Sequence, residues 1–222
     1  LSVAAGFAVK DVLVEGREHT DAELLLAVIN VRRGESIFTL NPHEAKKQVE
    51  KIGWVKKAHV ERRLPDTIHI RLTEHKPMAF WKDSDGVSLI NENGVEITRS
   101  NLNEFKDLPL LRGSNAANKA PEIIAALNAY PQLMKTVDHA ALIDKRRWNI
   151  ALKNGQRIKL PEKKVRAAID HIMTRHAENN ILDKKVITEI DARYEDRLII
   201  KTESGGVQDY KAGHVKASMT TQ

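Results

Sequence analysis

Several features are missing from this sequence of 222 residues, and each absence excludes a class of protein. It has no cysteine, so it contains no disulfide framework, no thiolate zinc site and no thiol nucleophile. No apolar run approaches the roughly 20 residues that a helix needs to cross a bilayer. Phosphate-binding loops, dinucleotide glycine patterns and Gly-x-Ser-x-Gly elbows are also absent. We therefore expect no enzyme, no cofactor, no metal and no small-molecule substrate.

Two remaining candidates for chemistry have ordinary explanations. His171 and His176 are five residues apart, which places them about 140° apart around a helix, whereas metal ligands prefer a spacing of three or four. Glu74 and His75 could form part of a general base, but an exposed strand end is the favoured interpretation.

The charge of the chain is positive, with 36 Lys and Arg against 30 Asp and Glu, a formal charge of +6. Such a balance suits an acidic partner, nucleic acid or an anionic membrane surface. Pairs of basic residues are spread from Arg32-Arg33 to Lys184-Lys185, and aromatic residues make up only 5%. A nucleic-acid binder usually gathers its cations on one element among aromatics, so a solvated surface is favoured.

The first 76 residues predict a compact βααββ unit. Phe7–Val14 is rich in β-branched and aliphatic residues and predicts a strand. Thr20 and Glu23 have the spacing of a capping box, which predicts a helix that ends at Gly34. Asn41 is a good N-cap for a second helix.

Two strands complete this unit. Ala58 and Val60 share one face of the first, and Ile68, Ile70 and Leu72 share one face of the second. The turn at residues 64–67 joins them into an antiparallel hairpin.

After Pro77 the pattern changes to short apolar stretches separated by hairpin-turn dipeptides such as Asn93-Gly94 and Asn154-Gly155. Helical periodicity occurs twice, at residues 121–130 and 162–179. The fold class is therefore α+β, with a mostly antiparallel β domain and two helices over residues 77–203. Residues 204–222 have little apolar content, and we expect a flexible tail.

Several motifs keep a specific order along the chain. They are Val12–Gly16, Gly34–Leu40, Ile52–Ala58, Leu64–Ile70 and Pro77–Trp81, then Arg146-Arg147-Trp148 and Asp191-Ala192-Arg193-Tyr194. The first group resembles the POTRA domain of the bacterial cell-division family FtsQ, called DivIB in other lineages. The second group resembles the β domain of the same family, except that Ala192 stands where the family usually has Leu. The resemblance covers about residues 7–203.

This resemblance implies a topology and a set of partners. It divides the chain into residues 1–6, a linker from a missing membrane segment, a POTRA domain at 7–76 and a β domain at 77–203. Family members have one transmembrane helix, place both domains in the periplasm, and work at the division site without enzymatic activity. They bind FtsB and FtsL and other divisome proteins, and no nucleic acid.

The same resemblance points to a binding site near the C-terminus. We expect the strand Arg197–Thr202 to be a free sheet edge that accepts an extended partner segment. The expected partner-binding residues are Arg193, Tyr194, Asp196, Arg197, Leu198 and Ile200. The alternative is that Arg193 and Tyr194 only brace the sheet.

A second surface is expected in the POTRA domain, where partners are recruited around its second strand and neighbouring helix. The matching residues are Val49, Trp54 and Val60, although packing in a core explains them equally well.

Two other functions remain open. A POTRA module for protein export or outer-membrane assembly would usually carry tandem POTRA units and a barrel, which the sequence does not show. A basic nucleic-acid-binding protein is the other alternative.

Overall fold

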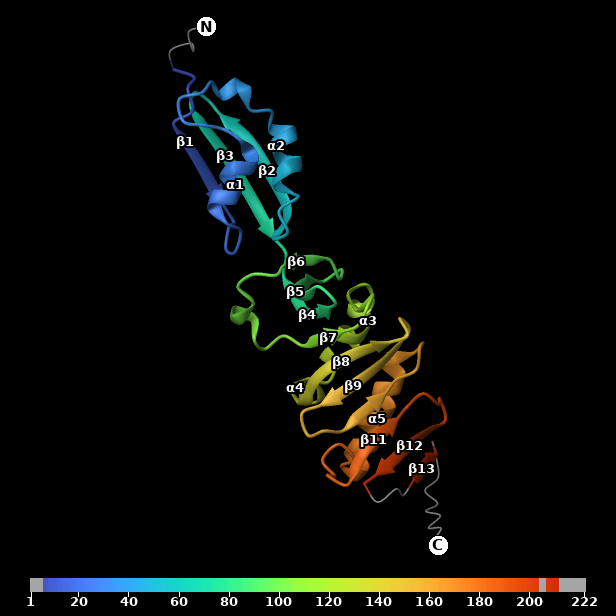
Figure 1. Ribbon diagram of the computed structural model, residues 1–222. Helices are drawn as coiled ribbons and strands as arrows, with labels where there is room; N and C mark the ends of the chain where they lie inside the picture. Colours follow the sequence, from blue (N-terminus) through green and yellow to red (C-terminus); the bar gives the residue numbers. More distant parts are fainter. Residues whose placement is uncertain (1–5, 204–206, 212–222) are drawn as a thin grey trace. The chain divides into compact units, whose positions relative to one another are not determined.

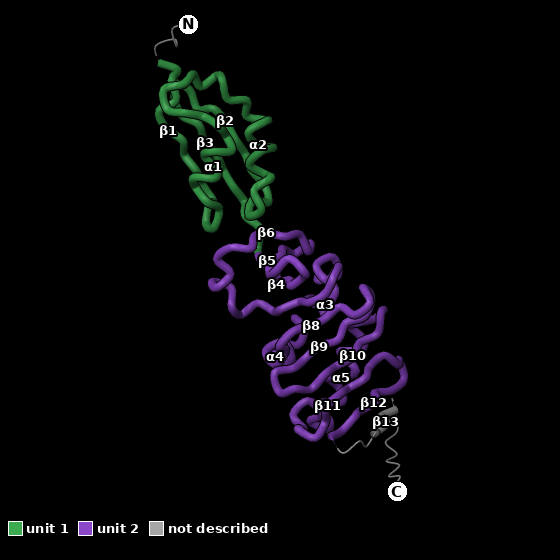
Figure 2. Tube along the Cα trace, viewed as in Figure 1, with its two compact units in different colours: residues 1–76 green, residues 77–222 purple. Residues whose placement is uncertain are grey.

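The computed structural model describes residues 6–203 and the backbone of residues 207–211. The chain divides into two compact units, Leu1–Lys76 and Pro77–Gln222, each with its own hydrophobic core (Figure 2). Within the described residues, no helix is both long and apolar enough to cross a membrane.

Unit 1 has the expected βααββ order, with one short 3-10 helix added (Figure 1). Its elements are β1 (Asp11–Glu15), α1 (Ala22–Ile29), η1 (Ile37–Thr39), α2 (Pro42–Val49), β2 (Val55–Arg63) and β3 (Thr67–Glu74). The sheet order is β1-β3-β2, with β1 parallel and β2 antiparallel to the central β3. Both helices contribute to the core against one face of this sheet, because Leu25 and Val49 cluster with Ile68 and Ile70.

The helix ends of unit 1 follow the sequence only in part. Asn41 caps α2 as predicted, since its Oδ1 accepts the amides of His43 and Glu44. The predicted cap of α1 is wrong: Asp21, not Thr20, accepts the amide of Leu24 at 2.8 Å. The helix also ends at Asn30, which adopts a left-handed conformation (φ 49°), four residues before Gly34. Asn tolerates that conformation better than most residues, so glycine is not required there.

Unit 2 is a ten-stranded sheet with helices, in the order β13-β12-β11-β10-β9-β8-β7-β4-β5-β6. Its first elements are β4 (Pro77–Asp83), β5 (Gly86–Asn91), β6 (Glu96–Thr98), η2 (Leu102–Phe105), β7 (Leu110–Arg112), α3 (Ala116–Asn128), α4 (Pro131–Thr136) and β8 (Val137–Ile143). The others are β9 (Arg147–Leu152), β10 (Arg157–Lys159), α5 (Val165–Asn179), β11 (Ile187–Asp191), β12 (Arg197–Thr202) and β13 (Val207–Lys211).

The predicted α+β class is confirmed, and most neighbouring strands of unit 2 are antiparallel. The parallel pairs are β4–β7, β7–β8 and β10–β11. The structure has a third helix, α4, where the sequence predicted two. Its six residues are too few to show helical periodicity, and Pro131 at its first turn separates it from α3.

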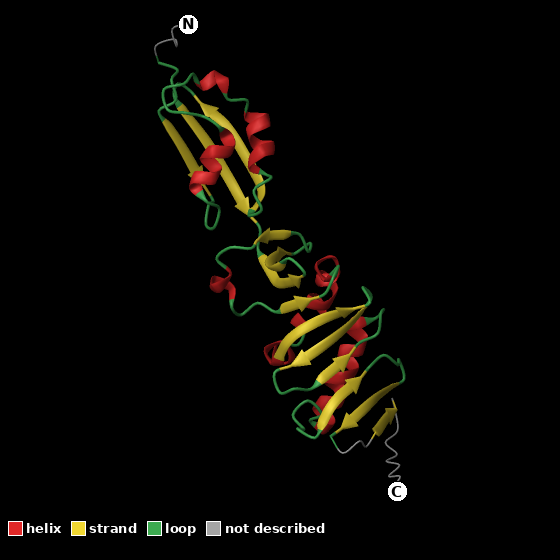
Figure 3. Ribbon diagram, viewed as in Figure 1, coloured by secondary structure: helices red, strands yellow, loops and turns green. Residues whose placement is uncertain are grey.

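Helices α3 and α5 pack on one face of the sheet (Figure 3). Trp148 is almost fully buried there, in the same core cluster as Ile150 of its own strand, Ile158 of β10 and Leu198 of β12. The strand residues that alternate with these therefore lie on the opposite face, which no helix of the described residues covers over β9–β12.

The expectation that Arg197–Thr202 is a free edge is wrong. β13 pairs antiparallel with β12 along five residues, with Ile199 opposite Asp209. Residues 207–211 of the expected flexible tail therefore form a strand, and the rest of that tail lies outside the described residues. The unpaired backbone groups of an edge strand favour such pairing, even for a segment with few apolar residues.

Candidate partner-binding site

The connection between β11 and β12 is held by an ion pair. Asp191 is the last residue of β11. Its carboxylate accepts hydrogen bonds from Nε of Arg193, at 2.8 and 3.0 Å, and a further hydrogen bond from Nη2 of the same residue. Burial raises the pKa of Asp191, but the hydrogen bonds from Arg193 outweigh it, so the pKa lies below its ordinary value. Arg193 therefore braces this connection, as the alternative interpretation of the sequence expected.

Tyr194 offers an accessible side chain at the same place. It is 42% exposed, and the guanidinium of Arg197 lies 4.8 Å from the centre of its ring. This is the geometry of a cation–π contact, which limits the orientations of the ring. A large ring held in this way is a suitable anchor for a partner, since little conformational entropy is lost when it is buried.

A groove of about 640 Å³ lies between this connection and the start of α5. Its lining includes Ala192, Arg193 and Tyr194 on one side and Ala168 and His171 on the other.

Two polar features line this groove. Lys164 and Glu195 bridge its two sides through an ion pair of 2.8 Å. Nε2 of His171 is buried and has no hydrogen-bond partner within the described residues. Burial lowers the pKa of His171, and Arg175 lowers it further. Sequence reasoning set His171 aside because its spacing to His176 does not suit a metal, and nothing in the sequence signals a groove.

Several expected binding residues do not reach the surface. Leu198 and Ile200 are buried in the core of unit 2, so their side chains cannot reach a partner. Val49 is 0% exposed and Val60 is 6% exposed, so neither can belong to a recruitment surface. Trp54 is half-buried and stacks on His19, with 4.4 Å between ring centres. An alternating pattern cannot separate a core residue from a contact residue, and burial does so here.

Glu74 has a structural function that the sequence did not predict. Its side chain is only 8% exposed. Its carboxylate accepts the amides of Glu18, His19 and Thr20 and the Thr20 hydroxyl, at 2.5 to 3.1 Å. Burial raises the pKa of Glu74, but these hydrogen bonds outweigh it, so the pKa lies below its ordinary value. The expectation of an exposed strand end is therefore wrong, because the loop after β1 folds over this carboxylate.

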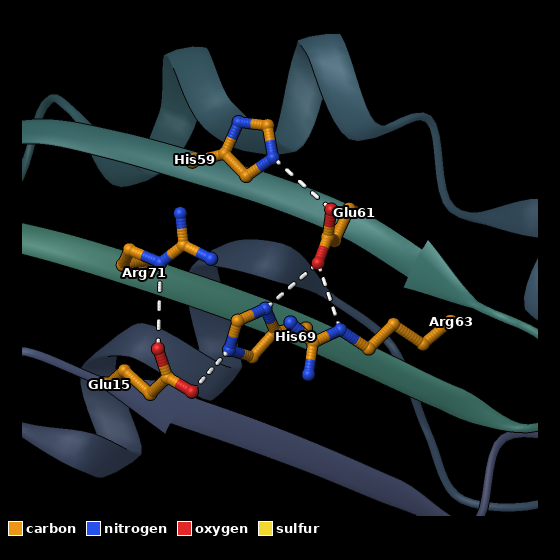
Figure 4. A network of polar contacts seen from close by, with 6 residues as sticks. All are labelled: Glu15, His59, Glu61, Arg63, His69 and Arg71. Carbon is orange, nitrogen blue, oxygen red and sulfur yellow. Dashed lines mark hydrogen bonds and ion pairs between the residues drawn. The ribbon is translucent and has the colours of Figure 1, made fainter.

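The helix-free face of the sheet in unit 1 carries a closed network of charges (Figure 4). His69 is 0% exposed and lies between two carboxylates: Nδ1 is 3.0 Å from Glu61 and Nε2 is 2.9 Å from Glu15. Arg63 pairs with Glu61, and Arg71 pairs with Glu15. Hydrogen bonds from His69 first, and then from Arg63 and His59, lower the pKa of Glu61 to about 2.

Comparison with known proteins agrees with this architecture. Residues 7–75 match the family model of the FtsQ-type POTRA domain, and residues 79–193 match that of the C-terminal part of the cell division protein FtsQ/DivIB. The cell division protein FtsQ of Rickettsia bellii is 33% identical over 196 residues, which are 88% of this chain and 73% of that protein. The FtsQ of Bradyrhizobium diazoefficiens is 29% identical, over 89% of this chain and 58% of its own length.

A solved structure also matches this chain. The major extracytoplasmic domain of the cell division protein DivIB from Geobacillus stearothermophilus is 17% identical and covers 63% of this chain and 80% of its own. Its TM-score is 0.19, which is too low to support any argument about this chain.

The two units and the matched models define a class: a bacterial cell-division protein in which a POTRA domain precedes an α+β domain. The chain belongs to the FtsQ/DivIB family. The family resemblance found in the sequence is thereby confirmed.

Proposed function

We propose that this chain is the periplasmic part of a single-pass inner-membrane protein that binds FtsB- and FtsL-type partners at the division site. In this proposal it links early and late division proteins and carries out no reaction. The transmembrane helix would precede Leu1, and residues 7–76 and 77–203 would act as the recruiting and partner-binding domains. Family membership supports the proposal, and so does the accessible Tyr194 beside the groove at the β11–β12 connection.

The structure changes the expected manner of binding. Because β13 covers the edge of β12, a partner cannot simply add to that strand in the conformation described. The exposed side chains here are Tyr194 and Asp196, with Arg197 held against the Tyr194 ring, and the groove beside α5 adjoins them. We therefore place the first contact on the connection and groove, and we assign Arg193 to holding the connection in shape.

Removal of the Tyr194 ring tests this proposal. We expect Tyr194→Ala to weaken binding of the extracytoplasmic fragment of an FtsB-type protein by at least about tenfold, as for a buried aromatic anchor. Isothermal titration calorimetry measures the affinity, and thermal unfolding should be little changed since the ring is exposed. Val186→Ala, which truncates another exposed side chain of unit 2, serves as the control. Normal binding by Tyr194→Ala would show that the site lies elsewhere.

A further inference from the structure

The helix-free face of the sheet at β10–β12 is rich in cations. In β10, Ile158 points into the core, so Arg157 and Lys159 lie on the opposite face. In β12, Leu198 and Ile200 point into the core, so Lys201 lies on that same open face. Lys201 is far from Arg157 and Lys159 in the sequence, and only the strand pairing through β11 brings it close to them.

The register defines how their charges are balanced. Glu189 of β11 lies opposite Arg157 on one side and Lys201 on the other. Its Oε1 accepts Nζ of Lys159 at 2.9 Å and lies 3.0 Å from Nζ of Lys201. Burial raises the pKa of Glu189, but hydrogen bonds from these two lysines outweigh it, so the pKa lies below its ordinary value.

The described carboxylates on the open face do not balance all of its cations. One carboxylate serves two lysines, and Arg157 has no side-chain partner among the described residues. Among the described side chains of β10–β12, the other carboxylate on this face belongs to Asp191, which is paired with Arg193. Glu189 is buried beneath the lysines, so an incoming group meets cations first. An excess of one sign on a partly desolvated surface attracts and orients a partner of opposite charge.

The chemistry of the face favours an acidic peptide over nucleic acid. Strands lie about 4.8 Å apart, so Arg157 and Lys201 are separated by about 10 Å and one carboxylate cannot reach both. A partner therefore needs at least two acidic side chains in one segment. Bases of single-stranded nucleic acid are usually held by exposed aromatic rings. Strands β9–β12 carry one aromatic residue, Trp148, and it is buried on the other face.

We propose that the open face of β10–β12 docks an acidic segment of a protein partner, with Arg157, Lys159 and Lys201 as its cationic contacts. The proposal rests on the proposed function, since it describes the chemistry of a division-protein partner, but it does not depend on the Tyr194 groove. Glu189 acts as a positioning residue because it holds both lysine side chains across the face.

A double charge deletion tests the surface. The full chain and its Arg157→Ala/Lys201→Ala variant are titrated into a fluorescein-labelled poly-glutamate peptide, with fluorescence anisotropy as the readout. We expect the dissociation constant to rise at least about fivefold and to become less dependent on salt, since two exposed charges are lost. Lys184→Ala/Lys185→Ala removes the same charge from an exposed segment of the same unit and should change binding by less than about twofold. Equal losses in both variants would reduce the effect to net charge and overturn the proposal.

Two further measurements distinguish an acidic-peptide surface from a nucleic-acid surface and from the proposed function. A single-stranded oligothymidylate of equal charge should bind more weakly than poly-glutamate at physiological salt. Tighter binding of the oligothymidylate that Arg157→Ala/Lys201→Ala abolishes would identify a nucleic-acid surface and overturn the proposal.

Binding of the FtsB-type fragment distinguishes this surface from the proposed function. If Tyr194→Ala weakens its binding but Arg157→Ala/Lys201→Ala does not, the proposed function stands and this surface is wrong. If the fragment fails to bind the unaltered chain while poly-glutamate discriminates between the variants, the surface stands and the partner is wrong.

Discussion

Each of the two sheets has a face that no helix covers within the described residues, over β9–β12 in unit 2, but the two faces use charge differently. In unit 1, Glu15 and Glu61 enclose His69, and Arg63 and Arg71 complete the pairs. In unit 2, Glu189 is shared by two lysines and Arg157 has no side-chain partner among the described residues. A closed network rigidifies its own sheet, whereas an excess of charge remains available to a partner.

The largest expected effect comes from removing a carboxylate that unit 1 uses internally. Glu74→Ala leaves the amides of residues 18–20 without their acceptor, so we expect unit 1 to lose about 3 kcal/mol of stability. Chemical denaturation measures this change, with the fluorescence of Trp54 as the signal. Trp54 belongs to unit 1 and therefore reports on its unfolding. Glu23→Ala, a change of an exposed carboxylate on α1, is the matched control. Equal stability of both variants would contradict the structural function of Glu74.

A pH titration examines the closed network directly. The pKa of Glu61 is lowered from 4.5 to about 2, so its ionised form is stabilised in the folded state. Its contribution to stability is therefore fully present above pH 4.5 and is lost as the pH falls toward 2. We expect the difference in melting temperature between the unaltered chain and Glu61→Gln to shrink across that range. A difference that stays constant from about pH 6 to about pH 2.5 would show that Glu61 is not coupled to His69.

The smallest effect should come from altering the shared carboxylate of unit 2. Glu189→Gln removes the negative charge that Lys159 and Lys201 share, so the open face becomes more positive. We expect poly-glutamate to bind about two- to threefold more tightly, provided that the amide still positions the lysines. Glu61→Gln, which makes the same change on the face of unit 1, should leave this affinity unchanged. Tighter binding by both variants would remove the distinction between the two faces.

Local sequence signals predicted those helices and strands that depend only on interactions between residues close together in the sequence. The cap at Asn41 and the alternation of Ile68, Ile70 and Leu72 need only neighbouring residues to be understood, and both are found as predicted. The same reasoning missed α4, which is too short for a periodic pattern, and β13, which depends on the edge that β12 offers. It also placed the cap of α1 at Thr20, because it could not know that Thr20 binds Glu74.

The location of the partner-binding site stays a prediction, and the structure bears only on which of its expected residues are exposed. The segment Asp191–Tyr194 was identified by its resemblance to the family, and the structure places Tyr194 on the surface there. Leu198, Ile200, Val49 and Val60 were expected to be contacts and are buried. A strand alternates in the same way whether one face meets a core or a partner, so sequence alone could not decide between these possibilities.

The sequence by itself determined most of the order of elements, the α+β class and the family, because capping, alternation and motif spacing are properties of neighbouring residues. The tertiary structure decided which charges meet. Residues 15, 61 and 69 come together on one sheet, and residues 157, 189 and 201 on the other, only through strand order and register. Whether a charged side chain is paired or available depends on those long-range contacts, so only the fold could distinguish the closed face from the open one.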